Sequence, residues 1–91
     1  MSDTDTTDIV GAPVAANVLR FLVQALVDDP DSVGVDAHEG RRGHVLLEVR
    51  TGPGDMGRVI GRRGRTAQSI RAVVRAAAAK DGVEVDVDFV D

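Results

Sequence analysis

The stretch MGRVIGRRGRTAQSIR, residues 56–71, places a Gly-x-x-Gly bend between two runs of apolar residues with helical spacing. The first run predicts a short helix over 56–60, with Asp55 as its N-cap, that stops at Gly61. After Gly64 the spacing resumes in a new phase, which predicts a longer helix that ends near residues 81–82. The residues that carry this pattern are Met56, Val59 and Ile60 in the first run and Ala67, Ile70, Val74, Ala77 and Ala78 in the second.

Another helix is predicted ahead of this stretch. Pro13 suits a first helical turn, and Asp29 stands before Pro30, which disfavours helical backbone at Asp29 and ends the helix there. Between them, apolar residues recur at i, i+3, i+4, i+7 and i+11: Ala15, Val18, Leu19, Leu22 and Leu26. Residues 1–10 are rich in Ser, Thr and Asp and are expected to form a disordered acidic tail, so that residues 11–91 make up a single domain.

Three segments alternate apolar and polar residues, which predicts strands with one buried face over 33–39, 44–50 and 83–89. The outer face of the third strand is expected to be acidic. The loop Gly40-Arg41-Arg42-Gly43 joins the first two strands, and Gly at both of its ends is typical of a hairpin. The second strand then crosses through two helices to the third, which most simply returns parallel and right-handed. The expected fold is α+β, in the order α-β-β-α-α-β: a three-stranded mixed sheet with three helices on one face, in two layers.

The formal net charge of −4 hides a separation of charge along the chain. Residues 56–80 hold six Arg and one Lys and no acidic residue, whereas the other 66 residues hold 4 basic and 15 acidic residues. Because charges are screened over about 8 Å at physiological salt, a partner docked on the basic segment responds mainly to that segment. The basic segment therefore favours an anionic partner in spite of the negative total.

The composition excludes several classes of protein. The 91 residues contain no Cys, which excludes disulfides and thiolate chemistry and suits a reducing compartment. No apolar run approaches the roughly 20 residues of a membrane span, and the N-terminus MSDTDTTD lacks the basic region of a secretory signal. We therefore expect a cytoplasmic protein that does not contact a membrane.

The letters GRRG occur twice, at 40–43 and at 61–64, in different predicted settings. In the first copy, between two strands, the Gly residues permit a turn, and Arg41 and Arg42 are expected to point into water. The second copy lies at the start of a helix, where backbone N–H groups lack intrahelical partners and attract anions. The guanidinium groups beside it, which suit phosphate oxygens, belong to Arg62, Arg63 and Arg65.

An aliphatic surface is expected next to the second copy, formed by Val59, Ile60 and Ile70. The chain has no Trp or Tyr and only two Phe, so it is a poor candidate for the RNA-binding folds that stack bases on aromatic rings. The interpretation that remains is a phosphate-binding loop beside an aliphatic surface.

The segment 56–71 resembles the KH motif, Ile-Gly-x-x-Gly-x-x-aliphatic-x-x-Ile, whose last two apolar places are filled by Ala67 and Ile70. The order α-β-β-α-α-β is that of the type II KH fold, and residues 13–91 are similar to the small bacterial single-KH proteins of the KhpA type. This resemblance implies a single-stranded RNA-binding protein, an RNA chaperone or post-transcriptional regulator. It also implies a larger partner with its own KH domain, of the KhpB (Jag) type, and self-association. The residues expected at the RNA are Gly61, Arg62, Arg63, Gly64, Arg65, Arg58, Ile60, Ile70 and Arg71.

Other sequence patterns in the chain point to nucleotide, metal or catalytic sites, and each lacks features that such a site requires. Residues 52–57 read G-x-G-x-x-G, but a dinucleotide site needs a full helix after them and a larger sheet, and a P-loop needs Lys-Ser/Thr where Arg58-Val59 stands. His38 and His44 flank the hairpin turn and are expected to be solvated rather than metal-bound. Nothing marks an enzyme, and neither a cofactor nor a metal is expected. The alternative to RNA binding is a KH-fold module for protein interaction or dimerisation that binds little RNA of its own.

Overall fold

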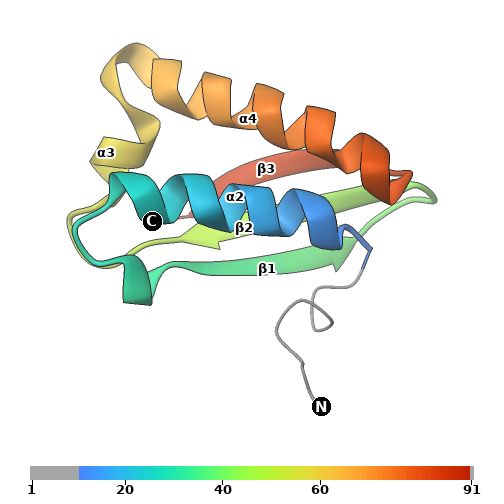
Figure 1. The fold of residues 1–91 in the computed structure, drawn as a ribbon, viewed down its shortest axis with the longest axis horizontal. Helices are drawn as coiled ribbons and strands as arrows, with labels where there is room; N and C mark the ends of the chain where they lie inside the picture. Colours follow the sequence, from blue (N-terminus) through green and yellow to red (C-terminus); the bar gives the residue numbers. More distant parts are fainter. Residues whose placement is uncertain (1–10, 91) are drawn as a thin grey trace.

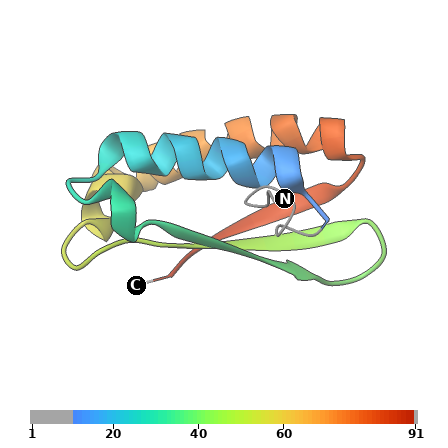
Figure 2. The same cartoon turned by 60° about the horizontal axis from the view of Figure 1, so that its bottom comes forward.

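Three helices lie on one face of a three-stranded sheet in the computed structural model, which describes residues 11–90 (Figure 1). Seen from the side, the helices form one layer and the sheet the other (Figure 2). The predicted order of elements and the α+β fold class are confirmed, whereas the predicted tail, residues 1–10, lies outside the described residues. In chain order the elements are α2 (Pro13–Leu26), β1 (Gly34–Glu39), β2 (His44–Arg50), α3 (Met56–Ile60), α4 (Arg65–Ala77) and β3 (Glu84–Val90), with short 3-10 turns η1 (Pro30–Ser32), η2 (Arg62–Gly64) and η3 (Ala78–Asp81).

The strands follow the order β1-β2-β3 across the sheet. β1 pairs antiparallel with β2, with Val35 opposite Val49, as the hairpin prediction requires. β2 pairs in parallel with β3, with Val45 beside Val85, because the chain between them passes through the helical layer. The predicted mixed sheet is thus confirmed, and β3 is an edge strand that lies beside α4 (Figure 1).

The core lies between the two layers and is built from the inward-facing residues of all three strands and the apolar sides of the helices. In β2, Val45, Leu47 and Val49 are buried and the residues between them are more exposed, as the alternation predicted. Leu19 of α2 and Val74 of α4 close the core from above with no exposed area. Burying one side chain of this size contributes about 1.5–3 kcal/mol, so these contacts fix the positions of the helices on the sheet. Within residues 11–90, no helix is long and apolar enough to span a bilayer.

Two carboxylates from distant segments hold the two ends of α2. At the start, Asp81 accepts hydrogen bonds from the amides of Val14 (3.0 Å) and Ala15 (2.9 Å). These amides belong to the first turn, where no intrahelical acceptor is available, and Ala12 in front of the helix has no side chain that could cap it. The negative charge at this end also interacts favourably with the helix dipole.

At the other end of α2, buried Asp55 accepts hydrogen bonds from the amides of Asp28 (3.3 Å) and Asp29 (3.2 Å). The chain turns to extended backbone at Val27, so α2 ends at Leu26, three residues before the predicted end at Asp29. The prediction that Asp55 caps the helix that follows it is wrong. Its carboxylate makes no capping bond to α3, because it is used by the segment after α2.

We expect Asp81→Ala to lower the free energy of unfolding by about 2 kcal/mol, because two amides at the start of α2 lose their acceptor. The matched control is Asp88→Ala, which removes an exposed carboxylate from the outer face of the sheet and should change stability by less than about 0.5 kcal/mol. Urea denaturation followed by circular dichroism measures both values. Equal losses in the two variants would contradict the role assigned to Asp81.

Candidate nucleic-acid interface

The GxxG loop, residues 61–64, joins α3 to α4 at one end of the helical layer (Figure 1). Its backbone is left-handed at three positions, with φ of 76° at Gly61, 57° at Arg63 and 73° at Gly64. At Gly61 a Cβ atom would overlap with Thr66 Oγ1 and lie 2.6 Å from Thr66 Cβ, whereas at Gly64 it would meet only open space. The two Gly residues therefore serve different purposes: Gly61 lets the chain pass Thr66, and Gly64 keeps the loop surface free of a side chain.

Hydrogen bonds within the chain already occupy part of the loop amides. The amides of Gly61 (3.0 Å), Gly64 (3.2 Å) and Arg65 donate to carbonyl oxygens of the preceding turn. The prediction that the amides at this helix start lack partners is therefore wrong for these three positions. The amides of Arg62 and Arg63 come before the first donor of the turn, and within residues 11–90 neither amide has a backbone acceptor, so both can serve a ligand.

Three Arg residues belong to this loop or follow it directly. Arg62, Arg63 and Arg65 are exposed, and none of the ion pairs found within residues 11–90 involves them. They can therefore bind a phosphate without first breaking an ion pair within that range. The loop also lies at the start of the 13-residue helix α4, whose dipole adds to the attraction for an anion.

Two other predicted site residues, Arg58 and Arg71, have partners within the fold. Arg58 pairs with two carboxylates, of which the closer is Asp28 (Nη2–Oδ2, 3.0 Å). Arg71 Nε donates to Val87 O of β3 (3.3 Å), and its guanidinium carbon lies 4.9 Å from the centre of the Phe89 ring. Both guanidinium groups therefore already have partners within the fold, and the RNA contacts expected of them remain predictions.

The expected aliphatic surface is only partly exposed. Val59 and Ile70 lie in the core with 0 % and 4 % exposure, because their sides of α3 and α4 face the sheet. Ile60 is half-buried and lines a shallow hollow of about 510 Å³ next to the loop, together with Gly54, Met56, Gly57 and Gly61. A base can contact Ile60, whereas Ile70 offers a base almost no area.

The first GRRG copy forms the turn between β1 and β2, as predicted. The amide of Gly40 donates to His44 O (3.1 Å), and the amide of His44 donates to Arg41 O (2.9 Å). The side chains of Arg41 and Arg42 are exposed. The two His residues beside this turn pair with carboxylates of neighbouring strands, and in the part of the chain that the structure describes no three potential metal ligands come together.

The outer face of the sheet is acidic, and the helices of residues 11–90 all lie on the opposite face (Figure 2). The acidic outer face predicted for the third strand is confirmed and extends over the other two strands. The carboxylates on this face belong to Asp36, Glu48, Glu84, Asp86 and Asp88. This excess of carboxylates disfavours an anionic chain on the outer face of the sheet, so the exposed Arg residues of the GxxG loop, which lie in the helical layer, are the better place for one.

Comparisons with known sequences point to one family. A family model described as "KhpA/KhpB, KH domain" matches residues 16–89. The "RNA-binding protein KhpA" of Leifsonia xyli subsp. xyli is 53 % identical over 76 residues, which cover 84 % of this chain and 96 % of the relative. Proteins of the same name from Streptomyces coelicolor and Halalkalibacterium halodurans are 52 % and 45 % identical, over 80 % and 81 % of this chain and 90 % and 96 % of the relatives.

Among solved structures, the fold is similar to part of Era in its complex with MgGDPNP and nucleotides 1506–1542 of 16S ribosomal RNA. The TM-score is 0.58 at 20 % sequence identity, and the match covers 82 % of this chain but 28 % of the Era chain. This likeness concerns the fold alone, because the chain spans less than a third of Era and shares few residues with it.

Proposed function

Since the chain belongs to the KhpA/KhpB family of KH-domain proteins, we propose that it binds single-stranded RNA and clamps the RNA backbone with its GxxG loop. Its proposed role is that of an RNA chaperone or post-transcriptional regulator in the cytoplasm. We further propose that it acts together with a larger KH-domain protein of the KhpB type.

The observation that carries this proposal is that the GxxG loop presents exposed Arg side chains and backbone amides to a ligand. Arg62, Arg63 and Arg65 are exposed at the positive end of α4, and the amides of Arg62 and Arg63 have no backbone acceptor in the part of the chain that the structure describes. Such a surface binds a phosphodiester through charge and backbone donors, and the open position at Gly64 lets the strand approach the peptide itself.

Recognition of the bases is expected to be tolerant of sequence. The hollow beside the loop is lined by Ile60 and Met56 together with three Gly residues, and such a lining offers van der Waals contact but few side-chain hydrogen bonds. Phosphate contacts carry no sequence information by themselves. We therefore expect the protein to bind single-stranded RNAs of many sequences rather than one particular sequence.

A partner protein would strengthen binding that is weak in one copy. The loop offers few contacts, and linking it to a second KH domain makes the second contact intramolecular and raises the affinity. Exposed apolar side chains on the helical layer support such a protein contact: Phe21 is 71 % exposed, Val73 49 % and Leu26 39 %. The same side chains favour the second candidate function, a dimerisation module that leaves RNA to its partner.

The salt dependence of binding tests whether the loop contacts phosphate. If Arg62, Arg63 and Arg65 neutralise about three phosphates, log K against log salt should fall with a slope of about −2 for single-stranded RNA. Fluorescence anisotropy of a labelled tetranucleotide, measured from about 50 to 300 mM salt, gives the slope. A flat line would overturn the proposed clamp.

A further inference from the structure

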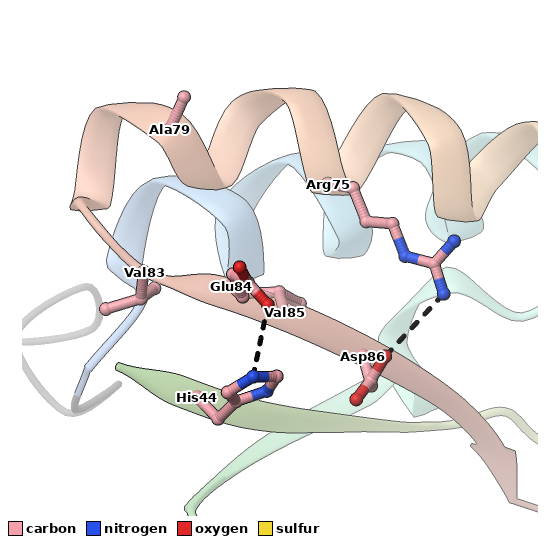
Figure 3. Close-up of a pocket in the computed structure, with 7 residues that line it drawn as sticks. All are labelled: His44, Arg75, Ala79, Val83, Glu84, Val85 and Asp86. Atoms are coloured by element: carbon pink, nitrogen blue, oxygen red, sulfur yellow. Dashed lines mark ion pairs between the residues drawn. The ribbon is translucent and has the colours of Figure 1, made fainter. Parts of the chain in front are cut away.

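A second hollow lies at the end of α4 that is remote from the GxxG loop, next to the start of β3 (Figure 3). It consists of two adjoining cavities of about 420 and 460 Å³, which share His44, Ala79, Val83 and Glu84. We call this site the distal hollow. Its size falls within the range of small-ligand sites and suits a single nucleobase with its sugar.

The lining of the distal hollow combines apolar side chains with a polar rim. Both rim carboxylates already have a side-chain partner: His44 Nε2 lies 3.1 Å from Glu84 Oε1, and Arg75 Nη2 lies 3.6 Å from Asp86 Oδ1 (Figure 3). A neutral ring with polar edges suits such a lining, whereas an isolated anion would be repelled by the two carboxylates. The apolar residues of the lining are Ala79, Val83 and Val85.

Two Arg residues on one side of α4 lead from the GxxG loop to the distal hollow. Arg71 and Arg75 are four residues apart and so lie one turn from each other on the same side of the helix. Both reach β3: Arg71 donates to Val87 O, and Arg75 pairs with Asp86. They form a cationic seam along the free edge of the sheet.

The distance along this seam defines the length of RNA that could use both sites. Gly64 and Ala79 are 15 positions apart, which corresponds to about 22 Å at the helical rise of 1.5 Å per residue. About seven stacked nucleotides, at 3.4 Å each, cover that distance. On the side away from the GxxG loop, the lining of the distal hollow includes Arg42 of the hairpin turn but not Arg41.

We propose that the distal hollow receives a base of the same RNA strand whose backbone lies on the GxxG loop, and that Arg42 contacts a phosphate next to this base. This inference rests on the proposed function and extends it to a longer RNA. The first GRRG copy then has two roles, because its Gly residues build the hairpin turn and one of its two Arg residues binds the far end of the strand.

The test compares Arg42→Ser with Arg41→Ser on two RNAs, a tetranucleotide and a dodecanucleotide. Both variants remove one exposed positive charge from the same turn, so nonspecific attraction falls equally in both. Arg42→Ser should weaken binding of the dodecanucleotide about fivefold and leave that of the tetranucleotide unchanged, while Arg41→Ser changes either affinity less than about twofold. Equal effects of the two variants on the dodecanucleotide would overturn the proposal.

A second variant tests the hollow itself. Ala79 is exposed and belongs to the lining of both cavities, so Ala79→Glu adds a negative charge at the hollow without disturbing the core, and it should also weaken only the dodecanucleotide. If both Arg42→Ser and Ala79→Glu bind the dodecanucleotide as the unmodified chain does, the distal hollow is not an RNA site. The GxxG clamp is judged separately, from the tetranucleotide, so the two proposals fail in distinguishable ways.

Discussion

Replacing Arg62 and Arg63 together by Asp is expected to lower the affinity for a tetranucleotide RNA about 100-fold or more, while the fold survives. Each lost Arg–phosphate contact accounts for about tenfold, and the two new negative charges repel the strand further. The fold should survive because both side chains are exposed and belong to none of the ion pairs found within residues 11–90. Fluorescence anisotropy gives the affinity, and circular dichroism with thermal unfolding checks the fold.

The chain supplies its own control for this experiment, since the same dipeptide occurs in the hairpin turn. Replacing Arg41 and Arg42 together by Asp changes the net charge by the same amount at a site that a tetranucleotide on the GxxG loop does not reach. This variant should lose less than about threefold through long-range repulsion, which is screened within about 8 Å. Full RNA binding by a folded variant of Arg62 and Arg63 would support the protein-interaction alternative instead.

Most of the fold could be predicted from local patterns. The helix at 56–60, the bend at Gly61 and the restart after Gly64 depend on residues within one turn of each other, and the structure has α3, η2 and α4 at these places. Apolar and polar residues alternate along the strands because one face of the sheet is buried. The loop after Glu39 is so short that the two strands it joins can pair only as an antiparallel hairpin. Handedness and strand direction then follow from general rules for crossovers.

The ends of α2 could not be predicted because their partners are remote in sequence. Asp81 binds the amide of Ala15 across 66 residues, and Asp55 binds that of Asp28 across 27. A capping rule based on neighbours in sequence predicts that Asp55 caps the helix directly after it. In the folded chain its carboxylate instead accepts hydrogen bonds from the segment after α2. Carboxylates that follow a helix or a turn in sequence are therefore ambiguous as caps until the packing of the layers is known.

The same distinction separates the parts of the candidate site. The three exposed Arg residues of the GxxG loop follow from the motif itself, whereas exposure of Ile70 depends on how deeply α4 sits on the sheet. The KH motif by itself does not predict how much of the side chain of its last Ile is buried against the sheet. Likewise, the partners of Arg58 and Arg71 come from the segment after α2 and from β3, and neither neighbour is visible from the spacing within 56–71.

Gly61→Ala is expected to lower the free energy of unfolding by about 3 kcal/mol or more, a large share of the stability of so small a domain. A left-handed φ of 76° disfavours any residue with a Cβ, by about 1–2 kcal/mol. The new methyl group would also overlap with Thr66, whose Cβ is 2.6 Å away and whose backbone amide is 3.1 Å away. Because Thr66 is part of the rigid α4, relief requires α4 to shift on the core, which close packing resists.

Gly64→Ala is the comparison, since Gly64 has nearly the same φ, 73°, but a Cβ there meets no atom within 4 Å. The ψ of Gly64, 11°, belongs to the left-handed helical region, whereas the ψ of Gly61, 176°, belongs to a region almost confined to Gly. The cost of Gly64→Ala should therefore be about 1 kcal/mol, and the difference between the two variants measures the contact with Thr66 together with the extra backbone strain at Gly61. RNA binding should show a different pattern, because the methyl group at position 64 stands on the open surface of the loop and hinders close approach of the phosphodiester. Urea denaturation and anisotropy on both variants should therefore show that Gly61→Ala loses mainly stability and Gly64→Ala mainly affinity. Equal losses of stability would show that the overlap with Thr66 is relieved at little cost, and unchanged affinity of Gly64→Ala would place the RNA away from that surface.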